Sequence, residues 1–370
     1  MNETDLTVRV ETGTRAYDIR IGNSLLEQAG PQICRWLQRP QDAALRILVV
    51  TDSTVQPLHA DPVRRSLAAA GVEVSVATVP SGEVSKSFAQ AQLLYDRLVD
   101  MAADRQTVVA AVGGGVVGDL AGFAAATYAR GLRLVQIPTT LLAMVDSSVG
   151  GKTGINHPRG KNLIGAFHQP VGVLIDLDTL ATLPEREYRS GLAEVVKYGV
   201  ILDAEFFSYL ENHVRELNAR DPAVLRYVVA RSCQLKADVV REDDFETTGR
   251  RAVLNYGHTF AHAFETLAGY GSLLHGEAVA AGMVCASRLA QKLGRISSEV
   301  TERQITLLSA LGFSISVPSD ICHRSSEIVR CMLLDKKSEG KSLRFVLPSR
   351  LGHVETVKGV TPELALECLS

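Results

Sequence analysis

Residues 107–119 read Thr-Val-Val-Ala-Ala-Val-Gly-Gly-Gly-Val-Val-Gly-Asp and combine the two signals that decide the fold. The first six residues form a short, mostly β-branched run, which is typical of a strand with both faces buried. The glycines that follow allow a tight turn, and the residues after them can continue as a helix. A strand that passes through a glycine turn into a helix predicts a parallel α/β sheet.

Similar strands lie on both sides of this unit, separated by helical stretches such as 85–101. They are expected at 46–50, 72–76, 132–137 and 171–175. Residues 6–10 and 17–21 alternate apolar and polar side chains around Gly13, as a β-hairpin does. Strands that alternate with helices strengthen the prediction of a parallel sheet.

The pattern changes after Pro184, where the apolar positions take helical spacing. The helices expected are 185–199, 203–217, 221–241, 255–268, 275–293 and 297–311. A late hairpin is expected at 343–347 and 353–357. The prediction is an N-terminal α/β domain at 1–184 followed by an all-α domain at 185–370.

Composition narrows the class of protein. The 370 residues are 46% hydrophobic and 22% charged, enough to bury the cores of two domains. A net charge of −2 argues against nucleic-acid or membrane-surface partners, which demand a basic excess. The polar, acidic N-terminus differs from a signal peptide, so we expect a cytoplasmic protein. The six cysteines form no CxxC pair and are expected to be reduced.

The glycine turn suggests a dinucleotide site in a Rossmann-like domain. Gly113, Gly115 and Gly118 satisfy G-x-G-x-x-G, where bare backbone approaches a pyrophosphate and a helix N-terminus stabilises its charge. Alone this pattern is weak, because the usual acidic residue about 20 positions later is missing. A simple turn of small residues is the alternative. Asp52, which ends an earlier strand, is a candidate for the ribose contact instead.

Three further polar turns leave strand ends and favour the dinucleotide interpretation. They span 81–86, 138–140 and 179–182. Gly150-Gly-Lys-Thr153 is not a triphosphate-binding loop, because Asp146 stands where that motif needs glycine. Lys152, Lys161 with Asn162, and Arg130 cluster in glycine-rich segments and favour an acidic substrate, although each alone is better explained as a solvated surface side chain.

Three of the nine histidines lie close together in sequence, which suggests a metal site. His258 and His262 share a face if their segment is helical, and His275 follows a glycine-containing turn at 270–272. Imidazoles combined with a carboxylate suit zinc, cobalt or iron and leave a coordination position open. The alternative is that one or two of these histidines only cap a helix or form hydrogen bonds within a helical core. Glu194, in an otherwise apolar helix with Lys197 on the same face, is the expected third ligand.

Together these motifs resemble the 3-dehydroquinate synthase family, part of the sugar phosphate cyclases. The likeness runs in order from about residue 46 to residue 347. It rests on Gly-Gly-Gly-Val-Val-Gly-Asp119, Val-Asp-Ser-Ser-Val-Gly-Gly-Lys152, Gly-Leu-Ala-Glu194-Val-Val-Lys197, Leu-Asn-Tyr-Gly-His258 and Leu-His275-Gly-Glu277. The resemblance implies an α/β domain that binds NAD, a helical domain that binds Zn²⁺ or Co²⁺, and a homodimer.

The resemblance also implies roles for individual residues. The metal ligands are Glu194, His258 and His275, so His262 becomes a substrate-side group. The other substrate-side residues are Lys152, Lys197, Lys236, Asn162, Arg130, Arg251, Asn255 and Lys336. The NAD-site residues, including those of the strand-end turns, are Asp52, Ser81, Gly82, Glu83, Lys86, Gly114, Gly115, Val116, Val117, Gly118, Asp119, Thr139, Thr140, Asp146, Lys152, Lys161, Thr179, Leu180 and Thr182. The stretch 246–251 is one residue longer than the family pattern, which leaves Arg250 as the alternative to Arg251, and Ala261 replaces an expected glycine.

The implied reaction converts 3-deoxy-D-arabino-heptulosonate 7-phosphate to 3-dehydroquinate and phosphate. It proceeds by transient oxidation by NAD, phosphate elimination, re-reduction and intramolecular aldol closure. Two other enzymes fit the same motifs: another sugar phosphate cyclase, and a metal-dependent polyol dehydrogenase that would accumulate NADH. A non-catalytic metal-binding scaffold is a third possibility, but it would not need the lysines.

Overall fold

The computed structural model describes residues 5–13, 15–38, 44–269, 272–334 and 343–369. The chain divides into two compact units, Met1–Pro184 with Leu225–Phe245, and Glu185–Val224 with Glu246–Ser370. One boundary between the units lies at residue 184, and 225–245 belongs with the first unit. In that unit the Cys233 thiol donates to the Met144 carbonyl at 3.3 Å. Helical periodicity predicts an apolar face, but it does not say which core that face joins.

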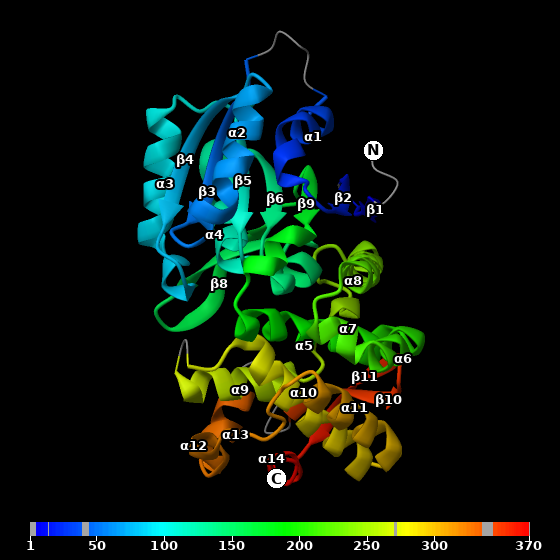
Figure 1. The fold of residues 1–370 in the computed structure, drawn as a ribbon. Helices are drawn as coiled ribbons and strands as arrows, with labels where there is room; N and C mark the ends of the chain where they lie inside the picture. Colours follow the sequence, from blue (N-terminus) through cyan, green and yellow to red (C-terminus); the bar gives the residue numbers. More distant parts are fainter. Residues whose placement is uncertain (1–4, 14, 39–43, 270–271, 335–342, 370) are drawn as a thin grey trace. The chain divides into compact units, whose positions relative to one another are not determined.

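The first unit contains a seven-stranded sheet with the order β1-β2-β9-β6-β5-β3-β4 (Figure 1). Its strands are β1 (Leu6–Glu11), β2 (Ala16–Gly22), β3 (Arg46–Asp52), β4 (Glu73–Val79), β5 (Val108–Gly113), β6 (Arg133–Pro138) and β9 (Gly172–Asp176). Only the β1–β2 pairing is antiparallel. The chain passes from β3 outward to β4 and then returns to β5 on the other side of β3, so the topological switch point lies between β3 and β5.

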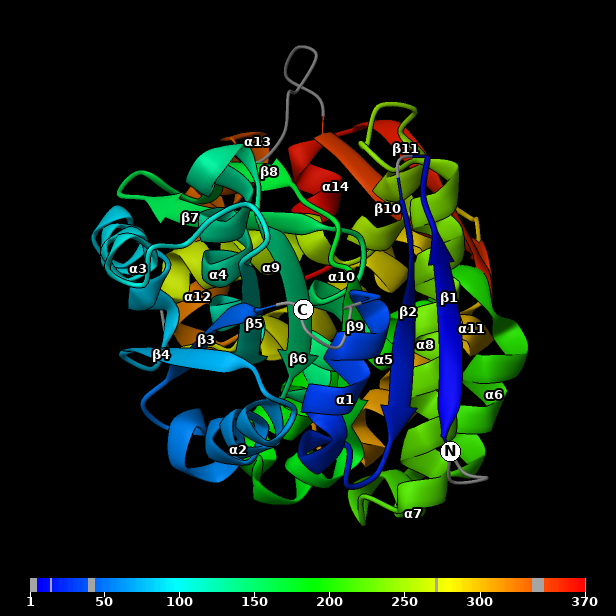
Figure 2. The ribbon, with the colours of Figure 1, turned by 90° about the horizontal axis from the view of Figure 1, so that it is seen from above.

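Helices cover both faces of this sheet, as Figure 2 shows. α1 (Ala29–Trp36) and α2 (Asp61–Ala69) pack on one face around Ile47 and Val49. α3 (Phe88–Asp100) and α4 (Gly115–Thr127) pack on the other around Leu48 and Val50. Alternate residues of β3 therefore enter opposite cores, which explains why its sequence is continuously apolar. The predicted α/β class is confirmed.

The glycine-rich segments around Lys152 and Lys161 form a separate hairpin of β7 (Lys152–His157) and β8 (Gly160–Phe167). Gly154 and Gly165 face each other across this hairpin. A Cβ atom on Gly154 would lie 2.7 Å from the Ile164 carbonyl oxygen. The glycines thus allow close strand approach, a role that their sequence alone does not distinguish from a loop.

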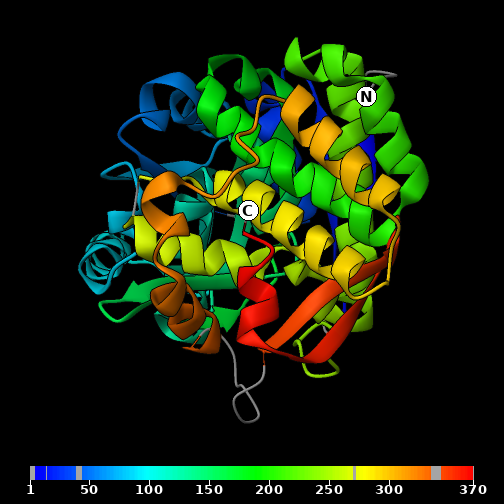
Figure 3. The ribbon, with the colours of Figure 1, turned by 90° about the horizontal axis from the view of Figure 1, so that it is seen from below.

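The second unit is mainly helical. Its elements are α5 (Glu185–Leu202), α6 (Ala204–Asn212), α7 (Val214–Asn218), α9 (His258–Ala268), α10 (His275–Lys292), α11 (Ser298–Ala310), α12 (Ser319–Cys322), α13 (Ser325–Leu334), β10 (Leu343–Arg350), β11 (His353–Val360) and α14 (Pro362–Leu366). The helix α10, yellow in Figure 3, contacts α5, α9 and the red strand β10. The helix α8 (Pro222–Glu242) lies almost wholly in the first unit.

Several helix boundaries differ from the sequence expectation. The helix expected at 203–217 is divided at His213, and α12 and α13 were not expected. α9 begins at His258, because residues 250–255 form a 3-10 turn and Gly257 has a φ of 78°. None of the helices in the described part of the chain has the length and hydropathy of a membrane span. The cysteines, all within the described residues, form no disulfide, and Cys233, Cys285 and Cys368 are buried.

Candidate active site

Glu194, His258 and His275 come together in the second unit, although 80 residues of sequence separate the first from the last. Oε1 of Glu194 lies 3.6 Å from Nε2 of His258 and 3.5 Å from Nε2 of His275. Four ligands at tetrahedral angles and bond lengths of about 2.1 Å lie about 3.4 Å apart. Both distances fit the spacing of ligands around one tetrahedral cation, and the three ligand atoms all lie within 4.8 Å of one another.

The other ring nitrogens of both histidines are also engaged. Nδ1 of His258 lies 3.0 Å from the carbonyl oxygen of Tyr256, and Nδ1 of His275 lies 3.4 Å from Oε2 of Glu265. Such partners fix the ring orientation and favour the tautomer whose Nε2 is the ligand. Both rings consequently present Nε2 toward Glu194.

The two imidazoles differ in protonation. Burial lowers the pKa of His258 to about 3, and the charge of Lys197 adds to this effect. Burial acts in the same direction on the pKa of His275, but hydrogen bonds to Glu194 and Glu265 outweigh it and raise that pKa to about 10. Burial therefore favours the neutral form of His258, whereas the two carboxylates beside His275 favour positive charge at that position, which a bound cation would also supply.

Helix α5 buries both charged residues predicted to share its face. The side chain of Glu194 is 0% exposed and that of Lys197 is 2% exposed, and the two form an ion pair one helical turn apart. Without water to solvate them, these charges must be neutralised by each other or by a ligand. Glu194 and Lys197, expected on one face of this helix, thus form a buried ion pair.

Close helix packing brings the ligands together. Gly276 follows His275, and a Cβ atom there would overlap the backbone of Ser190 on α5. Just before α9, the hydroxyl of Tyr256 donates to Oε1 of Gln304 at 2.8 Å. Hydrogen bonding of a buried tyrosine to a buried glutamine fixes the turn that carries His258. Sequence reasoning did not identify Gly276 or Tyr256 as supports.

The remaining predicted residues of the second unit lie near the start of α9. The ring of His262 stacks edge-to-face with that of His258 at 5.5 Å between centroids. Asn255 ends the 3-10 turn Arg250–Asn255. Arg251 is buried and Arg250 is exposed, which favours Arg251 over Arg250 as the candidate substrate-side arginine. Lys336 lies outside the described residues.

In the first unit the predicted NAD-site residues gather at the carboxyl edge of the sheet. Asp52 ends β3, and its Oδ1 accepts a hydrogen bond from Ser81 Oγ at 2.7 Å. The amide of Thr139 donates to the carbonyl of Gly113 at 2.9 Å, which joins the ends of β6 and β5. Thr179, Leu180 and Thr182 lie in the 3-10 segment Leu177–Thr182 after β9, and Gly82 precedes the segment Glu83–Ser85. Because β3 and β5 flank the switch point, this edge is where a ligand is expected.

The glycine turn leads directly into α4. β5 ends at Gly113 and α4 begins at Gly115, so Val116, Val117 and Gly118 form its first turn. Cβ atoms on Gly114 and Gly115 would lie 3.1 Å from Thr140 and 3.0 Å from Ser147. Residues 115–118 carry no acidic side chain, so the amides of this helix N-terminus favour an anion.

A polar network joins α4 to the β7–β8 hairpin. Nζ of Lys86 donates to Oδ2 of Asp119 at 2.7 Å and to Oδ1 of Asn162 at 2.5 Å. Nδ2 of Asn156 donates to Oε1 of Glu83 at 2.7 Å, while its Oδ1 accepts from the amide of Asn162 at 2.9 Å. Asn162 has a φ of 55°, so its backbone needs such support. Asn156 is a connecting residue that sequence reasoning missed.

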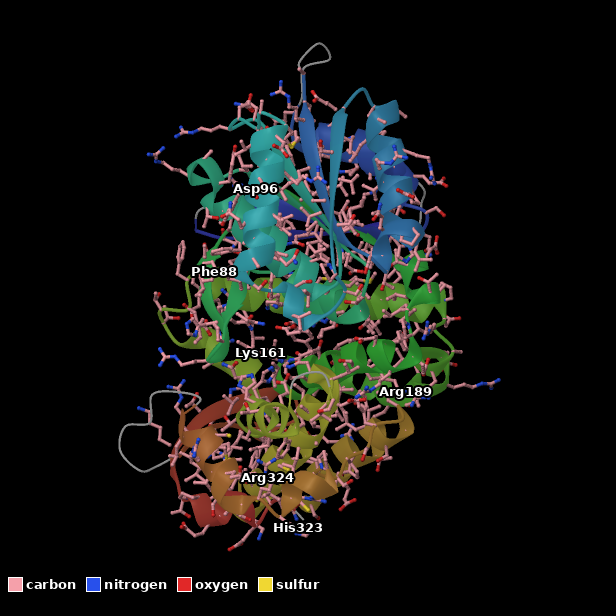
Figure 4. All side chains as sticks on the ribbon, turned by 90° about the vertical axis from the view of Figure 1, so that its left-hand side faces the viewer. Phe88, Asp96, Lys161, Arg189, His323 and Arg324 are labelled. Atoms are coloured by element: carbon pink, nitrogen blue, oxygen red, sulfur yellow. The ribbon has the colours of Figure 1, made fainter. Side chains whose placement is uncertain are left out.

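Burial raises the pKa of Asp119, and the adjacent Lys86 opposes this shift. A second amine, Lys236 on α8, donates to Oδ1 of Asp146 at 2.6 Å. Lys152 begins β7 and is exposed, whereas Lys161 of β8, labelled in Figure 4, is half-buried. Arg130 is exposed at the end of the turn Tyr128–Arg130. The first unit thus holds both the glycine turn and several of the predicted cations.

The sequence matches two domain models of one enzyme family. "3-dehydroquinate synthase N-terminal" matches residues 76–190, and "3-dehydroquinate synthase C-terminal" matches residues 191–338. The chain belongs to the 3-dehydroquinate synthase family. A family relative, the 3-dehydroquinate synthase of Desulforamulus reducens, is 50% identical over 98% of this chain and 99% of its own length.

Two solved structures of other sugar phosphate cyclases have the same fold. A 2-deoxy-scyllo-inosose synthase, complexed with carbaglucose-6-phosphate, NAD⁺ and Co²⁺, has a TM-score of 0.88 and 26% identity. The match covers 98% of this chain and 99% of that one. A 2-epi-5-epi-valiolone synthase from Streptomyces hygroscopicus, with NAD⁺ and Zn²⁺ bound, has a TM-score of 0.85 and 30% identity over 96% of both chains.

Proposed function

We propose that this chain is a 3-dehydroquinate synthase, which converts 3-deoxy-D-arabino-heptulosonate 7-phosphate to 3-dehydroquinate and phosphate. The observation that carries this proposal is the convergence of Glu194, His258 and His275 in a chain that matches both domain models of that family. The curated relative's identity of 50% favours this activity over that of the other cyclases, at 26% and 30%.

The residues present fit both cofactors. A carboxylate and two imidazoles are the donor set of a catalytic Zn²⁺ or Co²⁺ site with an open position. The glycine turn at 113–115 and the start of α4 suit the pyrophosphate of NAD. When bound, the cation would supply a Lewis acid for a substrate hydroxyl, and NAD would supply reversible hydride transfer without net consumption.

The side chains of this protein would hold and orient the substrate. We assign Lys152, Asn162, Arg130, Lys236, Arg251, Asn255, His262 and Lys336 to its carboxylate, hydroxyls and phosphate. Lysines and arginines neutralise a phosphate as it departs, which is a large electrostatic contribution in a site that excludes water. Lys197 has a second task, because it also neutralises buried Glu194.

We assign NAD binding to the switch-point residues of the first unit. Asp52 ends β3 as a candidate ribose acceptor. Lys86 and Asp119 are held together by their ion pair, and Lys161, Thr139 and Thr182 lie in the neighbouring turns and hairpin. Asp146, paired with Lys236, is assigned to the nicotinamide side. We further propose that the enzyme is a cytoplasmic homodimer with no nucleic-acid or membrane partner.

The test supplies the heptulosonate phosphate with substoichiometric NAD and Zn²⁺. We expect phosphate release in large excess over the NAD present, without accumulation of NADH. A chelator should stop the reaction and added Zn²⁺ should restore it. Stoichiometric NADH would support a polyol dehydrogenase instead, and absence of phosphate release from this substrate would contradict the proposal.

A further inference from the structure

Glu265 is a buried carboxylate to which the proposed reaction gives no role. It lies on α9, is 8% exposed, and has its Oε2 3.4 Å from Nδ1 of His275. A carboxylate in a protein interior is costly unless it serves a cationic partner. Its position, behind a ring that presents its other nitrogen to Glu194, suggests what that partner is.

The supports of the two imidazoles are chemically different. His258 donates to a neutral backbone carbonyl, that of Tyr256, whereas His275 faces a side-chain carboxylate. A carboxylate partner fixes the ring and makes its ligand nitrogen a stronger donor. The orientation of His275 therefore depends on a side chain that mutation can remove, whereas that of His258 depends on a backbone carbonyl.

Charge balance gives Glu265 a further effect. Glu194 is already paired with Lys197, and both are buried, so this pair offers a divalent cation no net negative charge. Both imidazoles are neutral when they act as ligands. Glu265 adds a negative charge within hydrogen-bonding distance of a ligand ring, which lowers the cost of placing a dication in this buried site.

We infer that Glu265 is a positioning residue for the metal site: it holds His275 with Nε2 toward Glu194 and supplies negative charge that the cation needs. The inference rests on the proposed metal site. It concerns affinity for the metal, so it is measurable without turnover.

The test compares three variants with the wild-type protein by chelator competition for Zn²⁺ and by the visible absorption of the Co²⁺ form. Glu265→Gln keeps the shape and an acceptor atom but removes the charge. Glu265→Asp keeps the charge on a shorter side chain. Glu299→Gln is the matched control, because Glu299 is exposed on α11 of the same unit.

We expect Glu265→Gln to weaken Zn²⁺ binding by about 10- to 100-fold and to alter the Co²⁺ spectrum. Glu265→Asp should bind Zn²⁺ more tightly than Glu265→Gln, and Glu299→Gln should match wild type. Thermal unfolding of the metal-free proteins would establish that the variants fold. Wild-type affinity in Glu265→Gln would overturn the inference and leave the proposed function intact. A wild-type protein that binds no Zn²⁺ would overturn both.

Discussion

The buried pair of Lys197 and Glu194 allows a prediction in which stability and metal binding are linked. In the metal-free protein, Lys197→Met leaves the Glu194 carboxylate, which is 0% exposed, without its lysine partner. Removing one member of a buried ion pair costs about 3–5 kcal/mol, because the other charge remains desolvated. We expect a loss of this size in the free energy of unfolding of the second unit.

Bound Zn²⁺ should reverse much of this loss. The cation neutralises Glu194 in place of the lysine, and Lys197→Met also removes a positive charge that repels the cation. A ligand that binds only the folded state raises stability by RT ln(1 + [L]/Kd), so the gain on adding Zn²⁺ should be larger in Lys197→Met than in wild type. Activity should nevertheless fall, because Lys197 is also assigned to the substrate.

The assay is denaturant unfolding, followed by circular dichroism with chelator and with excess Zn²⁺. Lys292→Met is the matched control, because Lys292 pairs with Glu367 on the surface of the same unit and should give wild-type behaviour in both conditions. Equal destabilisation of Lys197→Met with and without Zn²⁺ would refute the reasoning, since it would mean that the cation does not reach Glu194.

Three further predictions follow from other parts of the structure. Asn156→Ala removes hydrogen bonds to Glu83 and to the amide of Asn162, and NAD affinity should fall about 10- to 100-fold in calorimetric titration while Zn²⁺ affinity stays unchanged. Gly276→Ala should force α10 away from α5 and weaken Zn²⁺ binding more than tenfold in chelator competition, and wild-type affinity would disprove this packing argument. Burial lowers the pKa of His59 below 6.5, so its contribution to stability is present above that pH and is lost as the pH falls through the lowered pKa. Thermal unfolding midpoints should therefore fall less on acidification in His59→Gln than in wild type, and identical profiles would exclude this effect.

The sequence predicts the α/β sheet well because its central strands β3, β5, β6 and β9 are buried on both faces. Residues 47–50 form an uninterrupted apolar run, as expected of a strand with both faces buried. The glycine turn after Val112 indicates a connection from a strand to a helix. The switch point lies between β3 and β5. Asp52 and Gly113, which end these two strands, therefore lie at the edge of the sheet where a ligand is expected. The individual NAD and substrate contacts remain predictions.

Helical spacing alone gives an incomplete account of the metal site. It pairs His258 with His262, whereas the structure brings His258 to His275 and to Glu194 on another helix. The trio came instead from the family resemblance. Local periodicity cannot reveal it, because the close packing of α10 on α5 at Gly276 joins residues far apart in the sequence. Glu265, which meets His275 through the same packing, gave no sequence signal.

Other features were missed because one local pattern fits two structures. Glycines at 150–165 suit a loop as well as the closely spaced strands β7 and β8. The apolar face of α8 does not reveal that the helix packs with the first unit. Asn156 resembles any turn residue until its two side-chain hydrogen bonds are known.

The central claim is that Glu194, His258 and His275 hold one divalent cation. Zinc-edge X-ray absorption of the protein loaded with one equivalent of Zn²⁺ tests it most directly, with His275→Ala measured alongside. We predict a first shell with two imidazole nitrogens and one carboxylate oxygen in the wild-type protein, and loss of one imidazole in the variant. A first shell without imidazole, or one that His275→Ala leaves unchanged, would contradict the account.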